Sequence, residues 1–229
     1  MSVIVKICGL STEETLDAAL DAGAEMVGFV FFPKSPRFIA PARARELAER
    51  VRGRAEIVAL TVNLAEDDLA AIVETVRPDW LQLHGSETPD EVAAVQKRFG
   101  LGVLKAIGVS GAGDLPNILA HAGIADRLLL DAKPPQGSAL PGGNGVAFDW
   151  GVLDTLDASL PYMLSGGLDP DNVAEALSHT SAMGVDVSSG VESAPGIKDP
   201  ERIRAFLAAA RGPITATEPA RSAGVRIPS

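Results

Sequence analysis

The sequence predicts a (β/α)8 TIM barrel folded as a single domain, because short apolar runs alternate with longer helical runs eight times along the chain. The apolar runs are rich in Val, Ile and Leu on both faces, as in a parallel sheet covered by helices. Strict alternation with short connections leaves two architectures, the closed eight-fold barrel and the open doubly wound sheet. The count of eight favours closure, and no G-x-G-x-x-G motif follows the first strand as in a dinucleotide-binding fold.

Each predicted strand is followed by its own predicted helix. The expected strands are Val3–Ile7, Val27–Phe31, Ile57–Val62, Trp80–Leu83, Val103–Ile107, Arg127–Leu130, Tyr162–Leu164 and Gly184–Val187. The expected helices are Thr12–Asp21, Pro41–Val51, Glu66–Val76, Thr88–Phe99, Asp114–Ala120, Phe148–Leu156, Pro170–Ser178 and Pro200–Arg211. We expect residues 1–211 to form the barrel and the proline-containing residues 212–229 to form a flexible tail.

Composition and charge restrict the class of partner. The chain has 229 residues, of which 46% are hydrophobic, and its formal net charge is −10. This charge argues against nucleic acid or an anionic membrane as the main partner, but an acidic protein can still hold an anionic small molecule in a locally positive site. The single cysteine, Cys8, excludes an intrachain disulfide and suggests a reducing compartment. Because the N-terminus is not typical of a signal peptide and no apolar run approaches the length of a membrane span, we expect a cytoplasmic protein.

The reactive side chains gather at the predicted strand ends. Catalytic groups of such barrels lie at the C-terminal ends of the strands and in the loops that follow. The residues at these positions are Cys8, Arg37, Gln82, His84, Asp131, Ser165, Gly166, Gly167, Asp186, Ser188, Ser189 and Gly190. All of them are therefore expected on the same rim of the barrel.

The loops after the last two strands have the composition of a phosphate site. Gly166 and Gly167 follow one strand, and Ser188, Ser189 and Gly190 follow the next. Glycines let backbone N–H groups approach an anion closely, and loops seven and eight are the usual phosphate location in this fold. The alternative is that these glycines only make tight turns.

Cys8 and Asp131 are candidates for a base and an acid. A lone cysteine at a strand end is often only a small buried hydrophobe. However, Lys6 shares a strand face with Cys8, and a nearby cation favours the thiolate. Asp131 lies five strands later on the same rim, so the two groups would face each other across a bound sugar.

The remaining polar candidates predict substrate contacts and no metal. Arg37 is either a carboxylate clamp or a surface arginine, and we expect Gln82, His84 and Asp186 to contact substrate. The chain has three histidines, and no cluster with metal-ligand spacing occurs. We therefore expect no metal.

Seven motifs occur in one order along the chain. They are Lys6-Ile7-Cys8-Gly9, Phe32-Pro33-Lys34-Ser35-Pro36-Arg37, Gln82-Leu83-His84-Gly85, Leu130-Asp131, Gly142-Gly143-Asn144-Gly145 with Phe148-Asp149-Trp150, Leu164-Ser165-Gly166-Gly167-Leu168, and Asp186-Val187-Ser188-Ser189-Gly190-Val191-Glu192. Each motif alone is weak, but together they resemble the phosphoribosylanthranilate isomerase family of tryptophan biosynthesis, from about residue 3 to 211. It implies a (β/α)8 barrel and an Amadori rearrangement of a phosphorylated aminoaldose.

The resemblance also implies roles for single residues. Cys8 would be the general base at C2 of the ribose, and Asp131 the general acid that opens the furanose ring. Arg37 would orient the anthranilate carboxylate, and Gly143 would join the two glycine- and serine-containing loops around the phosphate. No cofactor is implied, since the substrate's own imine acts as the electron sink. The partner is then a phosphorylated small molecule, and the assembly is a monomer or a homodimer.

Three other functions remain open at this point. The related isomerase of histidine biosynthesis resembles this chain but carries an aspartate at the position of Cys8 and binds a second phosphate. A catalytically silent phosphate-binding barrel is a second alternative, although the chain retains Cys8 and Asp131. A lyase or decarboxylase that forms an imine on Lys6 or Lys105 is the third.

Overall fold

Eight parallel strands close into a barrel in the computed structural model, which describes residues 3–133, 148–157 and 159–212. The strands pair in chain order, and β1 pairs with β8 to complete the ring. The strands are β1 Ile4–Cys8, β2 Met26–Val30, β3 Glu56–Thr61, β4 Trp80–Leu83, β5 Gly102–Val109, β6 Arg127–Ala132, β7 Tyr162–Leu164 and β8 Gly184–Val187. The expected closed barrel is therefore confirmed, and the open sheet is excluded.

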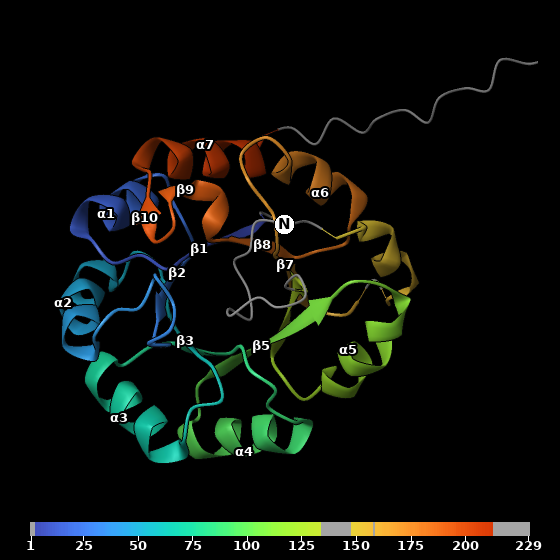
Figure 1. The fold of residues 1–229 in the computed structure, drawn as a ribbon, viewed down its shortest axis with the longest axis horizontal. Helices are drawn as coiled ribbons and strands as arrows, with labels where there is room; N and C mark the ends of the chain where they lie inside the picture. The colour runs from blue at the N-terminus through green and yellow to red at the C-terminus, as the bar shows by residue number, and fades with distance from the viewer. Residues whose placement is uncertain (1–2, 134–147, 158, 213–229) are drawn as a thin grey trace, which may run out of the picture.

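A ring of helices surrounds the strands (Figure 1). The α-helices are α1 Glu13–Asp21, α2 Pro41–Val51, α3 Glu66–Val76, α4 Pro89–Phe99, α5 Leu115–His121, α6 Val173–His179 and α7 Pro200–Ala210. The 3₁₀ helices are η1 Ala112–Asp114, η2 Trp150–Thr155 and η3 Ser189–Val191. Among the described residues, no helix is long and apolar enough to cross a bilayer.

Local sequence explains where several helices begin. Thr88 and Glu91 form a reciprocal capping box at the start of α4, which also carries Pro89 in its first turn. The Asp199 carboxylate caps α7 by accepting from two backbone N–H groups of its first turn. These signals are local, so they place the helix starts without help from tertiary packing.

Three parts of the element prediction are wrong. The segment expected as the helix Phe148–Leu156 forms only the 3₁₀ helix η2. The Asp149 side chain caps this short helix by accepting from the Gly151 N–H, and Gly151 itself has a low propensity for the α-helix. Helix α6 starts at Val173, three residues after the expected start, because Asp169 and Asn172 form a side-chain-bonded turn there. A two-stranded hairpin of β9 Glu192–Ala194 and β10 Ile197–Lys198 was not predicted, and it follows β8 and η3.

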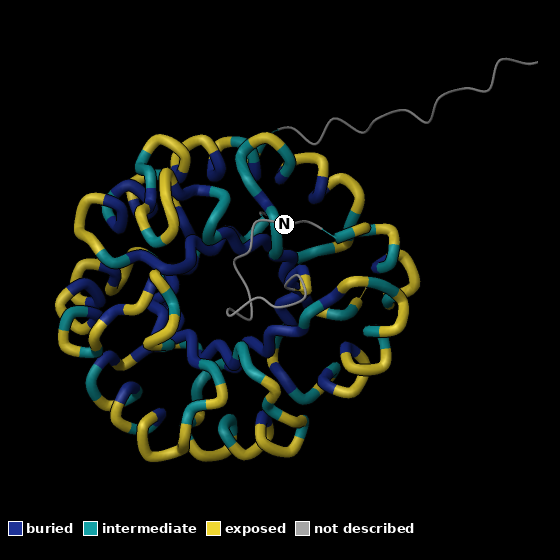
Figure 2. The backbone as a smooth tube through the Cα atoms, in the orientation of Figure 1, coloured by how far each residue is buried: buried dark blue, intermediate teal, exposed yellow. Residues whose placement is uncertain are grey.

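The strands separate two buried layers. Side chains that point outward pack against the helices and form the main core, whereas inward side chains fill the barrel. The inner fill includes Met26, Val58, Leu104, Leu129 and Met163. Figure 2 shows the buried ring of strands within the more exposed ring of helices. The bottom of the barrel is thus apolar and closed.

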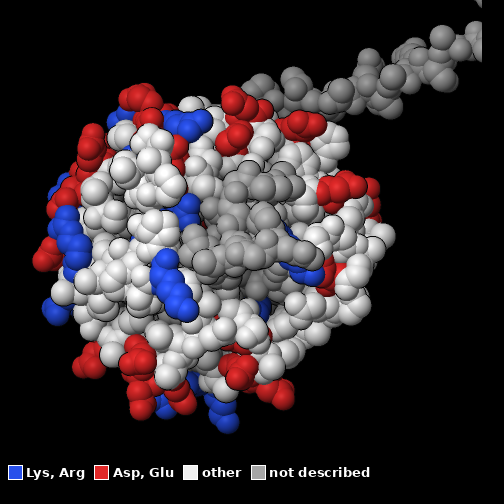
Figure 3. Space-filling model, in the orientation of Figure 1, with Lys and Arg blue, Asp and Glu red and all other residues white. Residues whose placement is uncertain are grey.

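Charged side chains lie mainly around the outside of the molecule. In Figure 3, Asp and Glu are spread over the helical ring and are interspersed with Lys and Arg. Several of these charges form exposed pairs, such as Arg54 with Asp21 and Arg98 with Glu66. No extended basic surface is visible among the described residues on this face, in agreement with the net charge of −10.

Candidate active site

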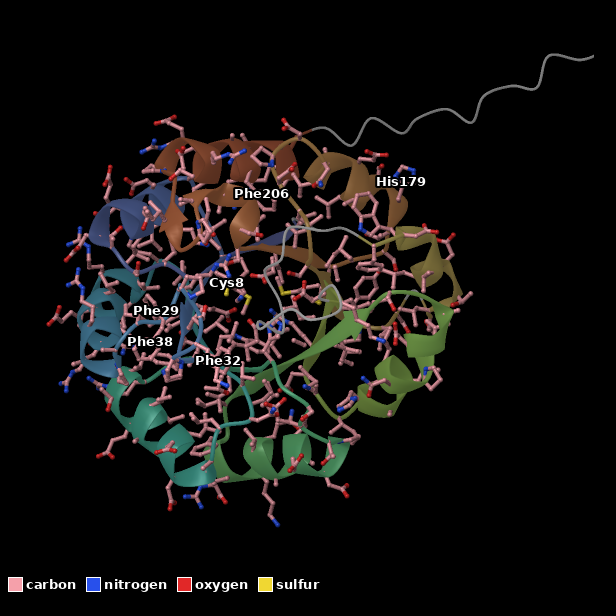
Figure 4. All side chains as sticks on the ribbon, viewed as in Figure 1. Cys8, Phe29, Phe32, Phe38, His179 and Phe206 are labelled. Carbon is pink, nitrogen blue, oxygen red and sulfur yellow. The ribbon has the colours of Figure 1, made fainter. Side chains whose placement is uncertain are left out.

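A cavity opens at the C-terminal ends of the strands and encloses about 650 Å³, open solvent included. It is lined by Cys8, Val30, Phe32, Ser35, Arg37, Leu60, Val62, Gln82, His84, Asp131, Ser165, Gly166, Gly167, Leu168, Asp186, Val187, Ser188 and Ser189. Figure 4 shows Cys8 within the ring of strands. One cavity thus contains both the predicted acid–base pair and most of the predicted binding residues, with an apolar wall beside them.

Cys8 lies at the end of β1 beside a buried ion pair. Nζ of Lys6 donates a hydrogen bond to Oδ1 of Asp186 across 2.8 Å, and both residues are buried. Burial raises the pKa of the Cys8 thiol, and the positive charge of Lys6 opposes this shift without cancelling it. Lys6 therefore favours the thiolate in the expected direction, but burial and the negative charge of Asp186 outweigh its effect on the Cys8 pKa.

Asp131 ends β6 and is held by a chain of polar groups from β4. Nε2 of the Gln82 amide lies 2.9 Å from Nδ1 of His84, and Nε2 of His84 lies 3.3 Å from Oδ2 of Asp131. With the amide donating to Nδ1, the Nε2 side of the ring faces the Asp131 carboxylate. His84 therefore orients Asp131 toward a fixed position on the rim.

Arg37 reaches the cavity from the loop after β2, and its guanidinium group is bound by a carboxylate of the protein itself. Its Nε and Nη2 atoms donate to Oε1 and Oε2 of Glu192 at 2.7 and 2.9 Å. The side chain is buried, so the alternative of a surface arginine is wrong. Glu192 accepts from two of the five guanidinium N–H groups, so this pair alone does not exhaust the donors of Arg37.

The phosphate candidates cluster at β7 and β8. Gly166 and Gly167 have φ angles of +86° and +66°, and Ser188 and Ser189 line the same part of the cavity. Gly190 is not among the residues that line the cavity. A Cβ at this position would lie 2.9 Å from the Leu168 carbonyl carbon. Gly190 thus permits close packing of the two loops, and the predicted Gly143 lies outside the described residues.

Lys6 and Lys105, the two lysines that an imine-forming enzyme would use, are each bonded to other groups of the protein. Lys6 is fully buried in its pair with Asp186. Lys105 donates to Gly85 O and to Oε2 of Glu87, each at 2.8 Å. Neither lysine lines the cavity, which argues against the lyase alternative.

The other two histidines lie away from the site. His121 ends α5 and bonds to the Asn117 and Glu87 carbonyls, and His179 lies on the outer helix α6 (Figure 4). Within the described ranges, no group of three His, Cys, Asp or Glu side chains could hold a metal ion. The site chemistry of the described residues is therefore that of carboxylate, thiol, imidazole and guanidinium groups.

Sequence reasoning missed two kinds of residue at the site. Phe32, Leu60, Val62 and Leu168 give the cavity its apolar wall, and only the Phe31–Phe32 pair after the second strand signalled it. Glu192 and Lys198 form a buried ion pair behind the lining. Lys198 lies only six residues from Glu192, but Arg37, the other partner of Glu192, is 155 residues away, so spacing along the chain could not reveal the cluster.

Comparison with known proteins agrees with this geometry. Residues 5–209 match the family model of N-(5′-phosphoribosyl)anthranilate (PRA) isomerase. An N-(5′-phosphoribosyl)anthranilate isomerase of Rhodopseudomonas palustris (strain BisB5) is 59% identical over 211 residues, which cover 92% of this chain and 97% of the relative. One from Rhizobium rhizogenes is 56% identical over 207 residues, covering 90% and 93%.

Solved structures share the fold as well. Phosphoribosyl anthranilate isomerase from Thermotoga maritima aligns with a TM-score of 0.83 and 37% identity, covering 92% of this chain and 99% of that one. A crystal structure of the enzyme with reduced 1-(o-carboxyphenylamino)-1-deoxyribulose 5-phosphate aligns with a TM-score of 0.79 and 34% identity, covering 92% and 99%. The chain belongs to the N-(5′-phosphoribosyl)anthranilate isomerase family.

Proposed function

We propose that the protein converts N-(5′-phosphoribosyl)anthranilate to 1-(2-carboxyphenylamino)-1-deoxyribulose 5-phosphate in L-tryptophan biosynthesis, by general acid–base catalysis. The observation that carries the proposal is the placement of Cys8 and Asp131 in one cavity together with Arg37 and the loops after β7 and β8. A base, an acid, a carboxylate partner and an anion site are the groups that an Amadori rearrangement of this substrate needs.

Ring opening is the first step of the proposed mechanism. Asp131, in its acid form, donates a proton to the furanose oxygen while the anilino nitrogen lone pair forms the C1=N bond. The C1–O bond breaks, which leaves an open-chain iminium and an Asp131 carboxylate. His84, 3.3 Å from Asp131, orients the acid toward the ring oxygen.

Proton abstraction is the second step. The Cys8 thiolate takes the proton from C2, and the C2–H electrons form the C1=C2 bond as the iminium nitrogen recovers its lone pair. The resulting enolamine gains a proton at C1 and loses the C2 hydroxyl proton, which gives the ketone. Cys8 ends protonated and Asp131 ends as a carboxylate, so proton exchange with solvent restores the starting state.

The substrate's two anionic ends have separate groups to bind them in the proposed site. The backbone N–H groups around Gly166 and Gly167, with Ser188 and Ser189, would hold the phosphate. Arg37 lines the cavity and would hold the anthranilate carboxylate. Gln82 and Asp186 line the same cavity and would contact the ribose hydroxyls. Gly143 stays a proposed phosphate contact.

The remaining proposals concern the setting of the reaction. We propose a cytoplasmic enzyme that acts on a phosphorylated small molecule, needs no cofactor and works as a monomer or homodimer. The proposed tail at 212–229 lies outside the described residues apart from Gly212.

The direct test is to add the protein to freshly generated phosphoribosylanthranilate and follow the anthranilate fluorescence. We expect a change whose rate is proportional to enzyme concentration. Binding of the reduced product without turnover would instead support a silent phosphate-binding barrel. Comparable turnover of the phosphoribosyl substrate of the histidine-pathway isomerase would show a broader enzyme than we propose.

A further inference from the structure

The Glu192 carboxylate lies between two buried basic side chains. Arg37 binds both of its oxygens, and Nζ of Lys198 donates to Oε1 across 2.7 Å. Burial raises the pKa of Glu192, but the hydrogen bonds from Arg37 and the charge of Lys198 outweigh this and hold the pKa below its ordinary value. Glu192 is therefore a permanent anion at neutral pH, fixed by partners on both sides.

This cluster lies behind the cavity and is joined to it at both ends. Glu192 and Lys198 do not line the cavity, whereas Arg37 and Ser188 do. Lys198 donates to the backbone oxygen and to Oγ of Ser188 at 2.9 and 3.1 Å, and Ser188 donates from Oγ to the Cys8 carbonyl across 3.1 Å. The network thus runs from Arg37, through Glu192 and Lys198, to Ser188 beside Cys8.

The hairpin that carries Glu192 packs tightly on the loop that carries Arg37. Gly196, at the tip of the β9–β10 hairpin, has a φ of +81°, and a Cβ there would lie 2.5 Å from the Pro36 carbonyl oxygen. The Gly196 N–H also donates to Oε2 of Glu192 across 3.2 Å. Backbone contact and side-chain pairing therefore hold the Arg37 guanidinium plane in one orientation.

We infer that Glu192 is a positioning residue that fixes the Arg37 guanidinium for the aryl carboxylate and thereby gives the enzyme its preference for carboxylated substrates. A bidentate carboxylate fixes a guanidinium in both direction and plane, because the two N–H bonds are parallel. Glu192 itself touches no substrate. The inference rests on the proposed function, because it concerns recognition of the anthranilate ring at the proposed site.

The test compares two ligands that differ only in the aryl carboxylate. One is reduced 1-(o-carboxyphenylamino)-1-deoxyribulose 5-phosphate, and the other is the same compound with an unsubstituted phenylamino group. Calorimetry gives the affinity ratio of the two ligands for each variant. A merely structural change in the site weakens both ligands alike, so the ratio isolates carboxylate recognition.

The main variant is Glu192→Asp, which keeps the negative charge between Arg37 and Lys198 but shortens the side chain by one methylene. Arg37→Ala removes the proposed carboxylate partner itself, and the double variant tests whether both changes act through the same group. Ile197→Ala is the matched control, since it alters a 60% exposed side chain of the same hairpin without touching the cluster. Thermal unfolding checks that each variant is folded.

We expect the wild type to prefer the carboxylated ligand by about tenfold or more, the usual scale for a charge-assisted hydrogen bond. Glu192→Asp and Arg37→Ala should each bring the ratio close to one, the double variant should lower it no further, and Ile197→Ala should keep it. A folded Glu192→Asp variant with the wild-type ratio, or with both ligands weakened equally, would overturn the inference.

The turnover assay of the wild type, run beside the calorimetry, separates this inference from the proposed function. If the wild type fails to turn over phosphoribosylanthranilate, the proposed function is wrong. If it turns substrate over but Arg37→Ala keeps the ratio, Arg37 is not the carboxylate partner, and the role of Glu192 is wrong with it. If only Glu192→Asp keeps the ratio, the function stands and the inference alone fails.

Discussion

Lys6 donates a hydrogen bond from Nζ to Oδ1 of Asp186 across 2.8 Å, and both groups are buried beside Cys8. Burial lowers the pKa of Lys6, but the charges and hydrogen bonds of Asp186 and Cys8 together outweigh this and keep the ammonium protonated. The pair is thus a fixed dipole beside the thiol rather than an isolated positive charge. Burial is therefore the main cause of the raised pKa of Cys8, and the charge of Asp186 adds to it against the effect of Lys6.

This arrangement predicts how the reaction depends on pH. Because the pKa of Cys8 is raised, the thiol is mostly protonated at neutral pH, and the thiolate fraction grows as pH rises toward that pKa. We expect the residual log kcat/KM of Asp131→Asn, in which the acid no longer titrates, to rise with a slope near one from about pH 7 to about pH 9, since kcat/KM reports the free enzyme. A flat profile of this variant over this range would contradict the assignment of Cys8 as a buried, protonated base.

The buried pair also predicts a large effect on stability. Lys6→Met leaves the Asp186 carboxylate buried without its cation, and we expect the free energy of unfolding in urea to fall by about 3–5 kcal/mol. Arg54→Met is the control, since it breaks an exposed pair with Asp21 and should change stability by less than about 1 kcal/mol. Equal effects of the two substitutions would show that the Lys6–Asp186 pair is not desolvated as described.

Asp131→Asn tests the acid. The amide keeps the size of the side chain and can still accept from His84, but it cannot deliver a carboxylic proton. We expect kcat to fall by about 10²- to 10⁴-fold while the affinity for the reduced product analogue changes little. Asp157→Asn, at an exposed turn, should leave kcat unchanged. Full turnover by Asp131→Asn would rule out Asp131 as the acid.

Gly166→Ala tests the proposed phosphate loop. Gly166 has a φ of +86°, and a Cβ there would lie 2.6 Å from Cβ of Ala132. Strain and overlap together should lower the free energy of unfolding by roughly 2–4 kcal/mol and weaken the binding of the phosphorylated analogue. Gly113→Ala, with open space around the added methyl group, should change neither measurement. Unaltered analogue affinity in Gly166→Ala would remove this loop from the phosphate site.

The barrel and most of the site lining could be predicted from sequence, because both depend on the order in which strands, strand ends and helices follow one another along the chain. Strand-end positions converge on one rim when a sheet closes, so Cys8, Asp131 and Asp186 could be placed before any coordinates. The direction of the Cys8 pKa shift could not be predicted from the sequence, because it depends on burial and on Asp186, which lies 180 residues from Lys6. The pairing of Arg37 with Glu192, 155 residues away, likewise exists only in the fold. The weak helix after β6 was misjudged because its capping turn competes with the helix.

The most direct test of the account compares wild type with Cys8→Ala in the fluorescence assay on freshly generated phosphoribosylanthranilate. We expect the wild type to convert the substrate and the folded variant to be slower by about 10²- to 10⁴-fold, with its affinity for the reduced product analogue retained. Conversion by Cys8→Ala at the wild-type rate would contradict the assignment of Cys8 as the base.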